Sequence, residues 1–105
     1  MAETVISEAD GGRTIPLRVG DTLRAELSEN PTTGFRWSVT PSDTQLLAIE
    51  DDTYQPTGGG IGGAGRRVVR LKAKDSGTTS VSFALARAWA QGTPHTHFLI
   101  TATIT

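Results

Sequence analysis

The chain has 105 residues, with 10 basic and 11 acidic side chains, a formal net charge of −1 at pH 7 and no cysteine. A chain of this length forms one domain, here residues 1–105, which buries roughly two-thirds of its unfolded surface. The balanced charge gives no general attraction to phosphate backbones or anionic membranes, so neither is an expected partner. Without cysteine there is no disulfide framework, no thiolate nucleophile and no cysteine-ligated metal site.

The start of the chain carries no recognisable export signal. Met1 to Thr4 contain neither a basic n-region nor an apolar h-region, and no segment reaches the ~20 apolar residues that span a bilayer. We therefore expect a cytoplasmic protein, or the trimmed form of a periplasmic or secreted one.

Apolar and polar residues alternate along most of the chain. Five blocks show this period of two: 23–27, 35–39, 69–73, 81–85 and 98–104. Such a period is typical of β-strands with one buried face, and turn signals at 10–12, 20–21, 41–43 and 74–77 separate the blocks. Residues 42–51 could form a helical turn, but one too short to change the class. The pattern predicts an all-β, antiparallel β-sandwich of about seven strands.

Three segments interrupt this alternation at every second connection. They are Asn30–Gly34, Gly58–Gly65 and Arg87–Trp89, here called the first, second and third motif segments. Strands of an antiparallel sandwich reverse direction at each connection, so alternate connections lie at the same end of the domain. A rigid β-frame that presents three loops side by side indicates a binding surface.

Each of the first two segments also has a plainer interpretation. Asn before Pro initiates turns, and a Gly at the end can take a positive φ, so Asn30–Gly34 could be an ordinary turn. The glycine-rich segment could be a flexible hairpin. Ordering this segment costs roughly 0.5–1 kcal/mol per glycine relative to alanine. So many glycines are therefore better explained by a backbone that must approach another molecule closely. A phosphate-binding loop is not expected, because Arg66 to Val69 continue as a strand rather than a helix.

The two tryptophans differ in their setting. Trp37 is in strand register with Phe35 and Val39, as a core residue should be. Trp89 lies just past the 81–85 block and beside Arg87, so it should project from a loop, and tryptophan with arginine is typical of binding hot spots. A Trp89 folded back on the rim of the sandwich is the alternative.

Catalytic and metal sites find little support in the sequence. His95 and His97 share a face at the start of the last strand, which suits a weak metal site or, more simply, a solvated strand edge. The acidic cluster at 50–52 shows no Ser-His-Asp or paired-carboxylate arrangement. We expect no cofactor and no catalysis.

Taken together, the three segments resemble the chagasin-like inhibitors of papain-family cysteine peptidases. That family carries Asn-Pro-Thr-Thr-Gly, Gly-x-Gly-Gly and Arg-Pro-Trp/Phe in three of its loops. The first motif is matched at every position, by Asn30, Pro31, Thr32, Thr33 and Gly34. The second is matched by Gly60, Ile61, Gly62 and Gly63. The third is present as Arg87, Ala88 and Trp89, with alanine in place of the family's proline.

The resemblance implies an immunoglobulin-like fold and a monomeric, reversible, tight-binding inhibitor whose partner is a papain-family cysteine peptidase. Thr32 and Thr33 would fill the catalytic centre, Gly60 to Gly63 would lay backbone along the cleft, and Arg87 and Trp89 would pack on its far wall. The alternative is a non-inhibitory immunoglobulin-like binding or adhesion module that uses the same loops on a protein or glycan. A small enzyme is the third choice.

Overall fold

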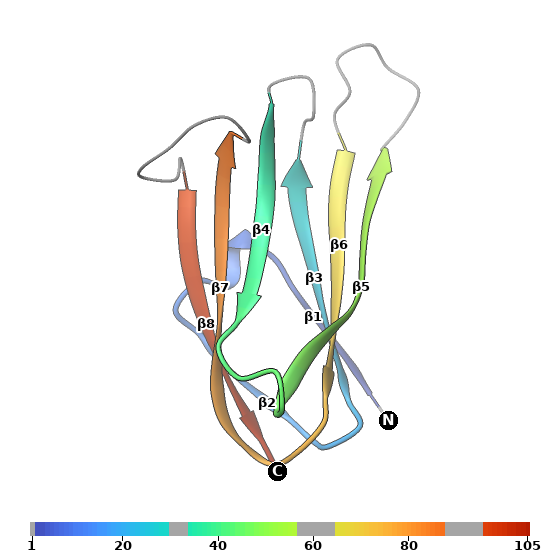
Figure 1. Cartoon of the computed structure of the whole chain (residues 1–105), viewed down its shortest axis with the longest axis vertical. Helices are drawn as coiled ribbons and strands as arrows, with labels where there is room; N and C mark the ends of the chain where they lie inside the picture. The colour runs from blue at the N-terminus through green and yellow to red at the C-terminus, as the bar shows by residue number, and fades with distance from the viewer. Residues whose placement is uncertain (1, 30–33, 57–64, 88–95) are drawn as a thin grey trace.

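The computed structural model describes residues 2–29, 34–56, 65–87 and 96–105. Within them, two four-stranded sheets pack face to face (Figure 1). The first sheet has the order β1-β3-β6-β5, with β1 Glu3–Ile6, β3 Thr22–Glu29, β6 Gly65–Ala73 and β5 Leu47–Pro56. The second has the order β2-β8-β7-β4, with β2 Thr14–Leu17, β8 Thr96–Ile104, β7 Gly77–Arg87 and β4 Phe35–Pro41.

The predicted β-sandwich is confirmed, with one refinement at its N-terminal edge. The eight strands include two short ones that pair in parallel, β1 with β3 and β2 with β8, while the remaining pairs are antiparallel. A 3-10 turn, η1 (Glu8–Asp10), lies between β1 and β2. Its capping box is formed by Ser7, whose Oγ accepts from the Ala9 N–H, and Asp10, whose carboxylate accepts from the Ser7 N–H at 2.9 Å. This turn lets the chain pass from the first sheet to the second.

The predicted inward faces form one core between the sheets. Every second residue is buried along β3, from Val69 to Ala73 in β6 and from Ile100 to Ile104 in β8, and Leu99 on the outer face of β8 is 43% exposed, as the alternation of the last strand predicts. Trp37 is buried as expected. Its ring meets that of Phe98 edge-on with centroids 5.6 Å apart, and Phe98 stacks on Phe83 at 4.5 Å. Aromatic pairs at these separations add to the burial of apolar area.

Residues 42–51 contain a helical turn followed by the start of a strand. The N–H groups of Leu46 and Leu47 donate to the carbonyl of Asp43 at 3.2 and 3.0 Å, which makes a single helical turn. Strand β5 then begins at Leu47. At the same end, Gly77 starts β7 with φ +145°, a conformation that other residues rarely adopt, and the Leu46 side chain occupies the place of a Cβ.

Six strand ends meet at the opposite end of the sandwich. In the first sheet Glu29 pairs with Gly65, which also pairs with Pro56. In the second sheet Phe35 pairs with Arg87, and β7 pairs with the start of β8. These ends flank the connections 30–33, 57–64 and 88–95, and in Figure 1 they all lie at the top. Among the described residues, no helix is long and apolar enough to cross a membrane.

Candidate binding site

Two of the twelve residues predicted to bind a partner lie in the described part of the chain. They are Gly34 and Arg87. Gly34 has φ +81°, so the first motif segment ends in a left-handed residue that favours glycine. Arg87 is the last residue of β7 and pairs with Phe35, the residue after Gly34. The first segment therefore ends just before β4 and the third begins at the end of β7, and these two strands are adjacent.

The other ten predicted residues lie outside the described residues. They are Asn30, Pro31, Thr32 and Thr33 of the first segment, Gly60, Ile61, Gly62 and Gly63 of the second, and Ala88 and Trp89 of the third. The described residues include the strand ends on either side of each segment. Those of the first and second segments meet where Glu29 pairs with Gly65.

Glu29, the residue just before the first segment, has a buried carboxylate. Leu23, Ala25 and Leu27 face the core, and Glu29 continues this inward series with its side chain only 1% exposed. A buried carboxylate is costly unless it is paired and hydrogen-bonded. Glu29 Oε1 accepts from the backbone N–H of Trp37 at 2.8 Å, and both of its oxygens accept from Arg67.

Arg67 lies in the inward register of β6, opposite Leu27 of β3. Its Nε lies 3.0 and 3.1 Å from the two oxygens of Glu29, and its Nη2 lies 2.9 Å from Oε2. Its Nη1 donates to Asp52 on β5 at 2.7 Å. The hydrogen bond to Glu29, followed by that to Asp52, raises the pKa of Arg67 despite its partial burial. This fork geometry is the strong form of an ion pair.

Trp37 joins the two sheets at this end through two hydrogen bonds. Besides the N–H donated to Glu29, its indole Nε1 donates to the carbonyl oxygen of Ser28 at 2.7 Å. Strand β3 belongs to the first sheet and β4 to the second. The two ends of the connection that carries the first motif are therefore fixed to each other.

The family of the chain follows from its similarity to known sequences. Residues 16–104 match the family described as chagasin family peptidase inhibitor I42. The chain belongs to this family. The match spans the residues from β2 to the end of β8 and so includes all three motif segments.

One curated protein resembles this chain in sequence, and two solved structures resemble it in fold. The chain is 28% identical over 90 residues to amoebiasin-2 of Entamoeba histolytica, covering 84% of this chain and 73% of that protein. Its fold matches the crystal structure of the cysteine protease inhibitor EhICP2 from Entamoeba histolytica with a TM-score of 0.91, 24% identity and coverage of 99% and 96%. It also matches PbICP-C, solved in complex with falcipain-2, with a TM-score of 0.70, 14% identity and full coverage of both chains.

No role was predicted from the sequence for two residues of this chagasin-family chain, Glu29 and Arg67. Both carry a signal that was available: each continues an alternating apolar series at the point where the strand meets a motif segment. A charged residue in an inward register is rarely left unpaired. Two such residues of opposite sign predict an internal ion pair.

Gly65, the last residue of the second motif segment, has no room for a side chain. A Cβ built there would overlap the Tyr54 hydroxyl of the neighbouring strand and would lie 2.8 Å from the carbonyl oxygen of Gln55. Strand β6 therefore starts under the ring of Tyr54, which requires glycine at this position.

The residues weighed for other chemistry have structural partners. His97 is exposed, and its Nε2 lies 3.1 Å from Ser82 Oγ, while His95 lies outside the described residues. No three described His, Cys, Asp or Glu side chains are grouped so as to hold a metal ion. In the acidic cluster, Asp51 pairs with Arg70 and Asp52 with Arg67.

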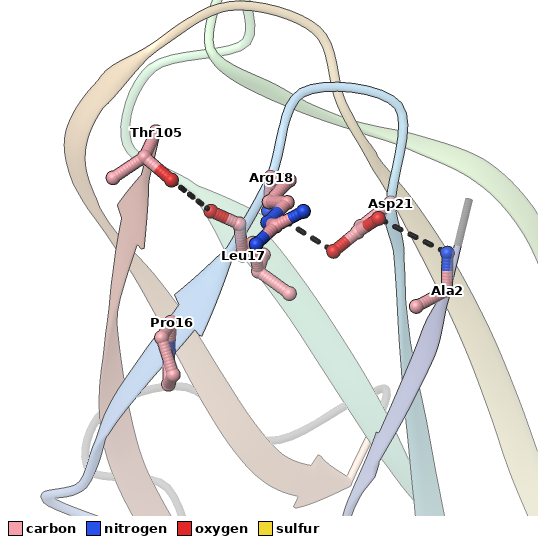
Figure 2. A pocket seen from close by; sticks show the side chains of 6 residues that line it. All are labelled: Ala2, Pro16, Leu17, Arg18, Asp21 and Thr105. Atoms are coloured by element: carbon pink, nitrogen blue, oxygen red, sulfur yellow. Dashed lines mark hydrogen bonds between the residues drawn. The ribbon is translucent and has the colours of Figure 1, made fainter.

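A hollow of about 420 Å³ lies at the end of the sandwich away from the motif segments, where β2 and β8 finish. Figure 2 shows the residues that line it, among them Asp21, whose carboxylate accepts hydrogen bonds from the backbone of this chain. The N–H groups of Arg18 and Ala2 each donate to it at 3.0 Å, and these hydrogen bonds lower the pKa of Asp21. The Asp21 carboxylate therefore links the turn between β2 and β3 to the residue just before β1.

Proposed function

We propose that this protein is a reversible inhibitor of papain-like cysteine peptidases that occludes the active-site cleft with three loops at one end of its β-sandwich. One observation carries the proposal: the strand ends that flank all three motif segments lie together at that end. Loops held side by side on a rigid frame suit a partner with a long, narrow cleft.

Each motif segment has a role that its chemistry fits. Thr32 and Thr33 fill the catalytic centre, while Gly60, Ile61, Gly62 and Gly63 bring backbone along the cleft, where a lack of side chains permits close approach. Arg87 and Trp89 pack on the far wall as the anchor of the interface. Asn30, Pro31, Gly34 and Ala88 shape the first and third segments.

Inhibition of this kind needs no reaction on the part of the inhibitor. The chain has no cysteine, so it cannot form a mixed disulfide with the catalytic thiol of the peptidase. We propose that one copy of residues 1–105, as a single non-catalytic domain without cofactor, blocks one peptidase by occupying its cleft. One solved structure of similar fold is a cysteine protease inhibitor, and another was solved in complex with falcipain-2; both support this partner class.

A panel of peptidases tests the proposal. The protein at a tenfold molar excess is incubated with papain, with a serine peptidase and with a metallopeptidase, and residual activity is measured on small substrates. Papain should lose its activity while the other two keep theirs. Full papain activity in the presence of the folded protein would contradict the proposal and would favour the adhesion or ligand-binding alternative.

A further inference from the structure

We infer that Glu29 and Arg67 are positioning residues: the buried ion pair holds the ends of the first and second motif segments in one fixed relation. The consequence for inhibition rests on the proposed function. Neither side chain is assigned a contact with the peptidase. They act through the strands that carry the segments.

The first step is that Glu29 links its own strand to two others from one buried position. It lies on β3, it accepts from the Trp37 N–H on β4, and it accepts a fork of hydrogen bonds from Arg67 on β6. Through Arg67 the network extends to Asp52 on β5. Four strands are thus joined through the side chains of Glu29, Arg67 and Asp52.

The second step is where these contacts lie along the chain. Glu29 immediately precedes residue 30, and Trp37 follows Gly34 by three residues, so Glu29 and Trp37 flank the first segment. Arg67 lies two residues after Gly65, the end of the second segment. A shift of Glu29 relative to Arg67 would therefore move one segment against the other.

The third step is that stability alone does not account for an ion pair here. The other inward positions of β3 and β6 are apolar: Leu23, Ala25 and Leu27, and Val69, Leu71 and Ala73. An apolar pair of similar volume is often as stable as a buried ion pair or more so, whereas directional hydrogen bonds select one arrangement. The ion pairs on the outer face differ: the side chains of Arg24 and Arg70 are 27% and 33% exposed, against 16% for Arg67.

The test separates position from stability with three variants of the full chain. Glu29→Gln keeps an acceptor for the Trp37 N–H but removes the charge that faces Arg67. Glu29→Gln combined with Arg67→Met leaves no unpaired charge in the interior. Arg70→Met is the matched control, because Arg70 lies on the same strand and pairs with Asp51 and Glu3 on the outer face. For each, the melting temperature and the inhibition constant for papain are measured.

The single Glu29→Gln variant should melt at a lower temperature, and the double variant should recover most of that loss. Inhibition by the double variant should nonetheless be weaker by about tenfold or more, because its segments are no longer preorganised. The Arg70→Met variant should inhibit like the wild type. Unchanged inhibition by the double variant would overturn the inference, as would a loss of inhibition that simply follows melting temperature in all three variants.

A second readout keeps this inference separate from the proposed function. Amide hydrogen exchange of residues 30–34 and of Trp37 should be faster in the double variant than in the wild type and should be unchanged in Arg70→Met. If the wild type does not inhibit papain, the proposed function fails, and exchange alone then decides whether the ion pair holds the segment. Equal exchange in the double variant and the wild type would overturn the positioning role.

Discussion

The backbone N–H of Trp37 donates to the buried carboxylate of Glu29 at 2.8 Å, which joins a strand of the second sheet to a strand of the first. The two residues flank the Asn-Pro-Thr-Thr-Gly motif, and the indole of Trp37 adds a second hydrogen bond to the carbonyl of Ser28. A recognition loop with both ends fixed loses less conformational entropy when it binds. These hydrogen bonds therefore lie where the residues proposed to bind the peptidase begin.

Replacing Trp89 with alanine should weaken inhibition of papain by about thirtyfold, because an aromatic anchor in a desolvated pocket contributes at least ~2 kcal/mol. The melting temperature should barely change, since the proposed role of Trp89 is in the interface. An inhibition assay and a thermal melt of the same preparation check both halves. A variant that unfolds, yet inhibits normally per folded molecule, would make Trp89 a core residue instead.

A bulky charged residue in place of Thr33 should abolish tight inhibition while the fold survives. Thr33→Arg puts a long cation where the proposed complex has the narrowest part of the cleft, and overpacking a fitted site typically costs about 1–3 kcal/mol, or roughly five- to a hundredfold in affinity. The inhibition constant is measured beside a circular dichroism spectrum. Thr101→Arg, on the outer face of β8, is the control and should inhibit normally. Equal inhibition by both variants would remove the first segment from the interface.

Restoring the family's proline in the third segment should be neutral or favourable. If Ala88 follows the backbone path that proline fixes, its φ is already near −65° and its N–H is not needed for a hydrogen bond. Ala88→Pro then stabilises the fold by roughly 0.4–1 kcal/mol and slows dissociation of the complex. Denaturant unfolding and the dissociation rate measure these effects. A melting temperature lower by several degrees would mean a different path, and the roles of Arg87 and Trp89 would have to be withdrawn.

A methyl group at Gly65 should destabilise the fold by about 1–3 kcal/mol, the usual range for overpacking. Gly65→Ala places a Cβ against the Tyr54 hydroxyl and within 2.8 Å of the Gln55 carbonyl oxygen. The same substitution in a Tyr54→Phe background should cost less, because the hydroxyl is gone. Urea denaturation of the four proteins gives the two differences. An identical cost in both backgrounds would mean that Tyr54 does not restrict this position.

The stability of the fold should fall in acid through Asp21. The N–H groups of Arg18 and Ala2 hydrogen-bond its carboxylate and hold the pKa of Asp21 below its ordinary value of 3.8. A carboxyl whose pKa is lower in the folded state stabilises that state fully above 3.8 and loses this contribution as the pH falls through the lower value. Thermal melts between pH 6 and pH 2 should therefore drop below about pH 4. The drop should be smaller in Asp21→Asn, and an equal drop would assign it to other carboxyls.

The parts of the fold that local alternation determines were predictable from the sequence. The inward series from Leu23 to Leu27 and from Phe98 to Ile104, and the core position of Trp37, follow from a period of two. Strands β1 and β2 were not predicted, because an alternation over only four residues is too short to identify a strand. Their parallel pairing is set by β3 and β8, which lie far away in sequence.

The candidate site was predictable in a different way. Its motif segments were found because they interrupt the alternation at every second connection, and the family resemblance then supplied a partner and a role for each residue. The Glu29–Arg67 pair was not predicted, although each residue lies in an inward register. Residues 38 apart in sequence form this contact, and no local pattern pairs them.

The equivalence point of a papain titration tests the central claim most directly. A fixed concentration of active papain, well above the inhibition constant, is mixed with increasing amounts of the protein, and residual activity is measured after equilibration. Occlusion of the cleft by one copy of the chain predicts a linear fall to zero activity at one equivalent, with activity returning on extended dilution. Activity that persists beyond several equivalents, or that recovers as the chain is cleaved, would contradict the account.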